Sequence, residues 1–144
     1  MGKKRIIKKS GGEVDAGLRA KSLAGGSKRR LERGVLHVEA TYNNTKVVLT
    51  DEKGNAIIAS SSGALGFAGA KKGTPFAAAK VGELLAEKAL QFGLKEVNVV
   101  IKGVGAGRES AVRAFIGKGP TLLSVRDVTP VPHNGPKAPR ARRV

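Results

Sequence analysis

The amino-acid sequence contains no cysteine and no tryptophan, and its only two histidines are His37 and His133. Without cysteine the chain has no disulfide framework, no thiol nucleophile and no cysteine-based zinc site. The two histidines lie far apart along the chain, which argues against a histidine-rich metal site. We therefore expect no metal and no bound cofactor.

The sequence also lacks a long apolar run. The apolar pair Ile6-Ile7 near the N-terminus is far shorter than the roughly 7–15 apolar residues of a secretory signal. No stretch approaches the length of about 20 apolar residues that a membrane-spanning helix needs. We therefore expect a cytoplasmic protein with no membrane partner.

Acidic residues are scarce, with 11 Asp and Glu against 27 Lys and Arg, so the net charge is +16. A charge of this size repels itself and usually serves to attract a polyanion. Its distribution is uneven. Residues 1–33 hold 11 basic and 3 acidic residues, residues 34–130 hold 12 and 8, and residues 131–144 hold 4 and none. We interpret these parts as a basic disordered arm, a folded domain and a basic tail.

The basic charge of residues 1–33 and 131–144 indicates that these two segments bind phosphate. Glycines interrupt any helix in residues 1–33, and prolines keep residues 131–144 extended. Cations in such segments neutralise phosphates whatever the base sequence. RNA is favoured over DNA because disordered basic arms become ordered on irregular RNA surfaces. The basic residues expected to bind are Lys28, Arg29, Arg30, Lys137, Arg140, Arg142 and Arg143.

Residues 34–130 carry the pattern of an α/β domain. The expected strands are Val35–Thr41, Thr45–Thr50, Ala56–Ser60, Glu96–Lys102 and Thr121–Asp127. The first three are joined by short turns, which predicts an antiparallel meander. Asn43 and Asn44 are expected to form the first turn, because asparagine tolerates left-handed geometry. The β-branched run in the fourth strand predicts burial on both faces.

Two helices are expected, one between the third and fourth strands and one between the fourth and fifth. Thr74 and Pro75 suit the N-cap and first position of a helix that runs to about Phe92 and stops at Gly93. A shorter helix is expected over Arg108–Phe115. The order β-β-β-α-β-α-β predicts a mixed sheet with helices packed on it.

The long connection at residues 61–73 is a candidate binding loop, because unstructured connections of this length are often functional. It contains Phe67, which would stack on a base, and Lys71 and Lys72, which would bind phosphate. The alternative is a mobile surface loop in which Phe67 packs into the core. The residues alone do not decide between these two interpretations.

A second candidate is the glycine loop, residues 103–107, which follows a strand and opens a helix. Gly103, Gly105 and Gly107 would leave backbone N–H groups free for an anion, and Arg108 would add a charge. Arg108 stands where a dinucleotide-binding motif needs glycine, and the Gly-Lys-Ser/Thr of a P-loop is missing. A nucleic-acid phosphate therefore fits better than a bound nucleotide, and a plain flexible turn is the alternative.

Two other classes of function stay open on the residues alone. One is a DNA-compacting or general nucleic-acid-binding protein. The other is a metal-dependent nuclease, which would need several convergent carboxylates. Glu39 and Asp127 could lie close together near strand ends, but their spacing in the sequence does not require this. We interpret His37 as a half-buried structural histidine and His133 as an RNA contact.

Four motifs resemble one protein family. Residues 34–45 (GVLHVEATYNNT), 74–78 (TPFAA), 103–110 (GVGAGRES) and 127–135 (DVTPVPHNG) are similar, in this order, to the eleventh protein of the small ribosomal subunit. The match spans about Gly34 to Val144 and includes a tail typical of the bacterial or organellar branch.

The resemblance implies a three-layer α/β fold related to the ribonuclease H type, without its catalytic acids. It implies a structural protein, not an enzyme and not a homo-oligomer, that binds ribosomal RNA in the platform. Neighbouring platform proteins and the messenger RNA exit path would lie close by. The residues it assigns to RNA are Asn43, Asn44, Lys71, Lys72, those from Gly103 to Arg108, and those from His133 through Asn134 and Gly135 to Arg143.

The chain departs from the family pattern at three places. Val104 and Ala106 stand where the glycine loop usually has prolines, which predicts a less rigid loop. Residues 136–139 (PKAP) replace the usual residues after Asn-Gly. The arm before Gly34 is longer than common, and its first half matches nothing in the family.

Overall fold

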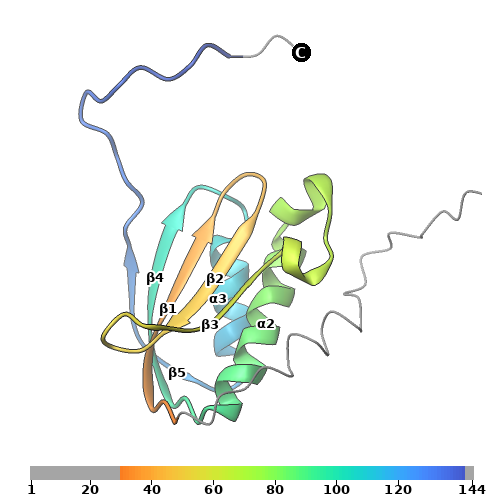
Figure 1. Cartoon of the computed structure of the whole chain (residues 1–144), viewed down its shortest axis with the longest axis vertical. Coiled ribbons are helices and arrows are strands. Elements are labelled where there is room, and N and C mark those ends of the chain that lie inside the picture. The colour runs from red at the N-terminus through yellow and green to blue at the C-terminus, as the bar shows by residue number, and fades with distance from the viewer. Residues whose placement is uncertain (1–29, 142–144) are drawn as a thin grey trace, which may run out of the picture.

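The computed structural model describes residues 30–141, which form a mixed five-stranded sheet with two α-helices (Figure 1). The strands are β1 (Arg33–Ala40), β2 (Thr45–Thr50), β3 (Ala56–Ser61), β4 (Glu96–Gly103) and β5 (Thr121–Asp127), in the spatial order β3-β2-β1-β4-β5. β1 pairs antiparallel with β2 and parallel with β4, and β5 extends the parallel half. The expected α/β class and the antiparallel meander of the first three strands are confirmed.

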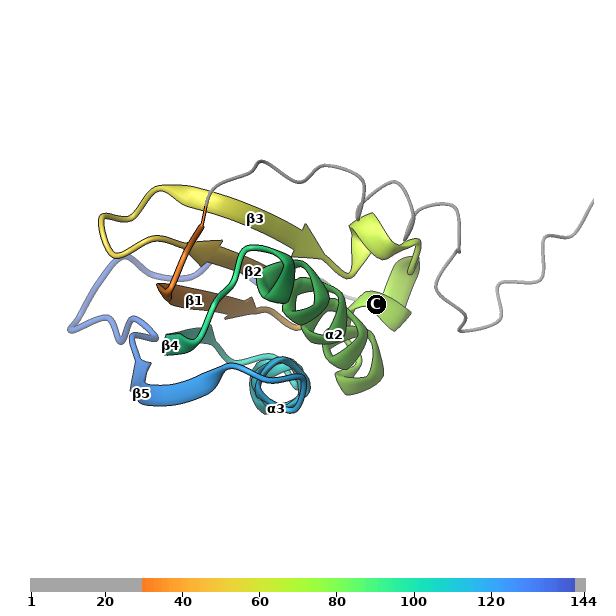
Figure 2. The same cartoon turned by 90° about the horizontal axis from the view of Figure 1, so that it is seen from below.

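Both helices cover the same face of the sheet (Figure 2). They are α2 (Pro75–Gln91) and α3 (Arg108–Ile116), which pack against each other. Side chains alternate along β1, so that Leu36 and Val38 are buried beneath the helices while His37 and Glu39 are exposed on the other face. The described residues therefore form two layers, and the expectation of three layers is wrong for residues 30–141.

The burial of β4 corrects a second expectation. Val97, Val99 and Ile101 are buried under the helices, whereas Asn98 and Val100 are only half-buried on the open face. A run of β-branched residues had predicted burial on both faces. The run instead reflects the preference of β-branched side chains for a pleated surface, whichever face is covered.

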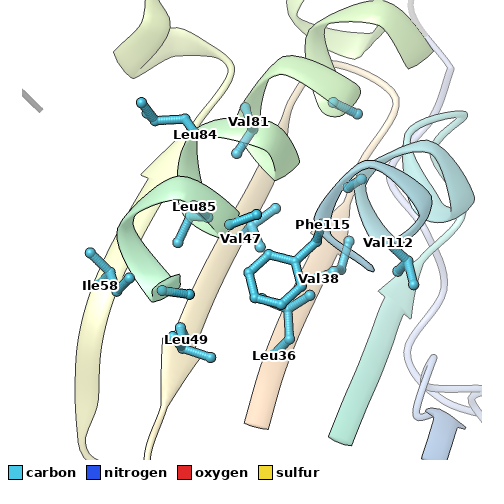
Figure 3. Close-up of a cluster of buried hydrophobic side chains, with 14 of the residues drawn as sticks. Leu36, Val38, Val47, Leu49, Ile58, Val81, Leu84, Leu85, Val112 and Phe115 are labelled. Atoms are coloured by element: carbon cyan, nitrogen blue, oxygen red, sulfur yellow. The ribbon is translucent and has the colours of Figure 1, made fainter. Parts of the chain in front are cut away.

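The core lies between the helices and the covered face of the sheet (Figure 3). Phe115 of α3 is fully buried at its centre, beside Leu36 and Val38 of β1. From α2, Val81, Leu84 and Leu85 point into the same cluster, because residues three and four positions apart share one face of a helix. This core holds the strand ends in fixed positions and so places the loops between them.

Segment boundaries agree closely with the predictions, with two exceptions. β2 and β5 have the predicted bounds, and the helix capped by Thr74 is confirmed. The connection at residues 61–73 is not unstructured, because it contains the 3-10 helices η1 (Gly63–Leu65) and η2 (Gly69–Gly73). The chain also joins the domain earlier than residue 34, since the Leu31 amide donates to the Phe92 carbonyl at 2.9 Å.

Thr74 joins η2 to α2 through its hydroxyl. Thr74 Oγ1 donates to the Lys71 carbonyl at 2.7 Å and accepts from the Ala77 amide at 3.3 Å. We expect Thr74→Ala to lower the free energy of unfolding by about 1 kcal/mol, the usual loss for an N-cap hydroxyl. Urea unfolding measures it. Thr74→Ser keeps the hydroxyl and should stay within about 0.5 kcal/mol of the wild type; an equal loss in both variants would contradict the capping role.

Candidate nucleic-acid interface

Four segments expected to bind RNA meet at one end of the sheet (Figure 1). We call this the loop end: the β1–β2 turn (residues 41–44), η2, the glycine loop (residues 103–107) and the chain from residue 128 onward. β1, β4 and β5 run parallel, so their carboxyl ends reach the same edge of the sheet. The Gly105 amide donates to the Ala40 carbonyl at 2.9 Å, and the Gly103 amide to Thr129 Oγ1 at 3.1 Å.

The β1–β2 turn is closed by Thr41 and not by left-handed asparagines. Thr41 Oγ1 accepts from the Asn44 amide and donates to the Asn44 carbonyl, both at 3.1 Å. Neither Asn43 nor Asn44 has a positive φ, so the turn was predicted correctly for the wrong reason. Asn43 is exposed, Asn44 is half-buried, and Tyr42 is 78% exposed. The turn therefore presents Tyr42 and Asn43 to a partner.

Of the two aromatic residues on either side of η2, the one that faces outward is not the one expected. Phe67 is 9% exposed and belongs to the core, as the alternative interpretation of this loop expected. Phe67 therefore cannot stack on a base. Its ring makes an edge contact, with centroids 6.1 Å apart, with Phe76, which is 52% exposed. Lys80 Nζ lies 5.6 Å from the Phe76 ring centroid. Lys71 is exposed and Lys72 half-exposed beside them.

The glycine loop packs against the protein itself. A Cβ added at Gly103 would lie 2.1 Å from the Ala40 carbonyl oxygen, and one at Gly105 would lie 2.2 Å from that of Thr41. At Gly107 it would meet the Thr45 hydroxyl at 2.5 Å. The close approach that glycine permits is therefore used within the domain, and these three residues are not explained by contact with a phosphate. Sequence alone does not distinguish the two, because either contact requires glycine.

Arg108 is engaged inside the domain, contrary to the expectation that it faces a phosphate. Its guanidinium donates to the Gly103 carbonyl, to Thr129 Oγ1 at 3.1 Å and to Asp127 Oδ2 at 2.5 Å. Its side chain is 29% exposed. The Thr129 hydroxyl and then Arg108 hold the pKa of Asp127 well below its usual range. This ion pair leaves the loop end without an unpaired acid at Asp127.

The C-terminal tail leaves the domain from the loop end and is exposed along its described length. His133, Asn134, Gly135, Lys137 and Arg140 are all exposed. Asn134 is the one non-glycine residue of positive φ, 56°, among the described residues, so the His-Asn-Gly sequence forms a bend. Arg142 and Arg143 lie outside the described residues.

At the other end of the chain, the expected basic contacts are mostly beyond the part that the structure describes. Lys28 and Arg29 lie outside it, and Arg30, the first described residue, is exposed.

A family model described as ribosomal protein S11 matches residues 34–143. The chain belongs to the ribosomal protein S11 family. The protein is thus a structural constituent of the small ribosomal subunit that binds ribosomal RNA, and it works in the cytoplasm as part of the ribosome. The match covers the folded domain and the described tail, which are the parts where the sequence motifs occur.

Family membership rejects the nuclease alternative, since S11 proteins are structural and not enzymes. Glu39 lies between Lys46 and Lys102 on the open face of the sheet, while Asp127 pairs with Arg108. Within residues 30–141 no three His, Asp or Glu side chains gather as metal ligands would. No helix in the same part of the S11 chain is long and apolar enough to cross a membrane.

Sequence reasoning missed several exposed groups near the site. Tyr42 and Phe76 are the aromatic residues of this S11 protein that face outward at the loop end. Lys46, Lys102 and Arg126 are exposed on the open face of the sheet. Only the placement of both helices on the same side of the sheet shows that one face is open and which lysines it carries (Figure 2).

Proposed function

We propose that this S11-family protein binds small-subunit ribosomal RNA through the loop end, with the C-terminal tail as its main phosphate-binding segment. The observation that carries the proposal is the convergence of exposed cations on one end of the sheet. Lys71, Lys72 and the tail extend from it, and the nearby acids Asp127 and Glu109 are paired with Arg108 and Arg113. An RNA backbone there would meet positive charge and little repulsion.

The exposed aromatic residues give the loop end a second means of contact. Phe76 lies in the first turn of α2 and Tyr42 in the β1–β2 turn, and exposed rings of this kind stack on unpaired bases. Lys80 beside Phe76 places a cation next to the ring. The site is therefore suited to single-stranded or irregular RNA, where bases are free to leave the helix stack.

The position within the subunit is the finer part of the proposal. The sequence resemblance supports a location in the platform near the messenger RNA exit path, beside neighbouring platform proteins and as a single copy. Crosslinking from Tyr42 and from residues 137–140 in assembled subunits would identify the RNA and protein neighbours.

We also propose that the fold is related to the ribonuclease H type. Support comes from the order β3-β2-β1-β4-β5, in which β1 is central between an antiparallel and a parallel neighbour. Superposition on solved domains of that type tests this relation.

The experiment that tests RNA binding measures affinity for a platform fragment of ribosomal RNA at several salt concentrations. If several phosphates are contacted, log Kd should rise with log salt with a slope of about 0.7–0.9 per phosphate. A flat plot would contradict the proposal. Equal affinity for duplex DNA of the same length would favour a general nucleic-acid-binding protein instead.

A matched pair of double variants locates the binding surface. Lys71→Gln with Lys72→Gln removes two charges at the loop end. Lys53→Gln with Lys95→Gln removes two exposed charges at the opposite end of the sheet, in the β2–β3 turn and before β4. Only the first pair should lower the salt slope, by about 1–2. Equal losses in both would show that net charge and not the loop end determines binding.

A further inference from the structure

A hydrogen-bonded network of four residues lies where the C-terminal tail leaves the domain. Asp127 ends β5, Thr129 follows two residues later, Arg108 begins α3 and Gly103 ends β4. The Val128 amide between them donates to the Ile101 carbonyl at 2.9 Å, which continues the sheet pairing by one residue. The end of β4, the start of α3 and the end of β5 therefore meet where the tail begins.

Thr129 is the centre of this network. Its hydroxyl donates to Asp127 Oδ1 at 2.6 Å and accepts from the Gly103 amide and from Arg108 Nη1, both at 3.1 Å. Its own amide also donates to Asp127 Oδ1 at 2.9 Å. A hydroxyl has one donor and two acceptor positions, and all three are used here. The backbone at Thr129 is therefore held from both sides.

Arg108 and Asp127 connect the ends of two neighbouring strands. The guanidinium reaches Asp127 Oδ2 and the Gly103 carbonyl at once, so it joins the end of β5 to the end of β4. A planar guanidinium that donates to several acceptors at once adds geometric specificity to charge. The two side chains are 29% and 52% exposed, and each is the ion-pair partner of the other.

Beyond Thr129 the chain is exposed from Pro130 to Ala141, and Figure 1 shows it extending away from the sheet. Pro130, Pro132, Pro136 and Pro139 fix φ at four positions and favour an extended path. A stiff segment keeps the direction set at its base. The orientation of Thr129 therefore sets the direction of the tail as far as the bend at Asn134, beyond which Lys137 and Arg140 follow.

We propose that Arg108, Asp127 and Thr129 form a lock that fixes the direction in which the tail leaves the domain and so presents its cations to RNA in advance. Arg108 is then a positioning residue and not a phosphate contact. The inference rests on the proposed function in so far as the tail binds RNA. A segment oriented in advance loses less conformational entropy on binding than a free one.

Asp127→Asn in the full chain separates the lock from simple electrostatics, because the two predict opposite signs. The substitution removes an acid and raises the net charge by one, so electrostatics alone predicts tighter RNA binding. The lock predicts weaker binding, by about threefold to tenfold, since the tail must be ordered on the RNA. Glu109→Gln makes the same charge change in the first turn of α3, outside the lock, and should bind as tightly as the wild type or more tightly.

Thr129 supplies a variant pair with no change of charge. Thr129→Val removes the hydroxyl at nearly constant shape and should weaken RNA binding by about the same factor as Asp127→Asn. Thr129→Ser retains the hydroxyl and should restore wild-type affinity. In a full chain whose tail cations are neutralised by Lys137→Gln, Arg140→Gln, Arg142→Gln and Arg143→Gln, neither Asp127→Asn nor Thr129→Val should weaken binding further.

A measurement without RNA tests the lock independently of the proposed function. The chain has no cysteine, so Ala64→Cys and Ala138→Cys, both at exposed positions, place two spin labels on the domain and the tail. The distance distribution should be narrower in the otherwise wild-type and Glu109→Gln chains than in the Asp127→Asn and Thr129→Val chains.

The outcomes are distinct. Equal distributions in all four chains, or Asp127→Asn binding RNA as tightly as Glu109→Gln, would refute the lock. A wild-type chain that fails to bind RNA while the distributions differ as expected would refute the proposed function and leave the lock standing.

Discussion

Replacing Gly103 with alanine should lower the free energy of unfolding by about 3 kcal/mol or more, through backbone strain together with a clash against the neighbouring strand. Gly103 has a φ of 104°, which L side chains rarely adopt. A Cβ there would also lie 2.1 Å from the Ala40 carbonyl oxygen, which belongs to the neighbouring strand and has no room to move. β1 and β4 would have to separate at the loop end, and the Gly103 contacts with Thr129 and Arg108 would be lost with them.

Gly54 is the matched control because it shares the strain without the clash. Its φ is 92°, and nothing lies within 4 Å of where its Cβ would be. Gly54→Ala should therefore lower the free energy of unfolding by only about 1–2 kcal/mol, the penalty of a left-handed conformation. Urea unfolding followed by circular dichroism compares the two. If Gly103→Ala proves no worse than Gly54→Ala, the contact between the glycine loop and β1 is not as close as the structure has it.

The secondary structure was predictable because its signals are local. Thr74 and Pro75 mark the start of α2 by capping and by a fixed φ, and both act within one turn of helix. The short turns between the first three strands are likewise marked by consecutive residues. Such signals identify each element and its bounds, but not which face of the sheet a helix covers.

What sequence reasoning missed depends on contacts between distant residues. Phe67 and Phe76 are both aromatic residues near a lysine, and only the packing of η2 against α2 decides that Phe67 is buried and Phe76 exposed. Arg108 illustrates the same point. Its engagement with Asp127 requires β4, α3 and β5 to meet, since the two residues are 19 positions apart in sequence. Charge and glycine content identified the candidate segments. Tertiary contacts determine which residues of those segments are engaged within the domain and which are exposed.

Neutralising the four tail cations should have the largest effect on RNA binding. Lys137→Gln, Arg140→Gln, Arg142→Gln and Arg143→Gln together should lower the salt slope by about 3 and weaken binding by about a hundredfold near 0.1 M salt. The described part of the tail is exposed, so the free energy of unfolding should stay within about 0.5 kcal/mol of the wild type. Fluorescence titration of a labelled RNA fragment at several salt concentrations measures both the affinity and the slope.

The control removes the same amount of charge from another part of the surface. Arg33→Gln, Lys53→Gln, Lys95→Gln and Lys118→Gln neutralise four exposed cations away from the tail. If the tail binds phosphates directly, this variant should lose less than tenfold in affinity and less than about one unit of slope, because only long-range attraction is reduced and salt screens it. Equal losses in the two variants would mean that RNA responds to net charge alone. A selective loss in the tail variant would show that the tail cations, which extend from the loop end, contact the RNA phosphates themselves.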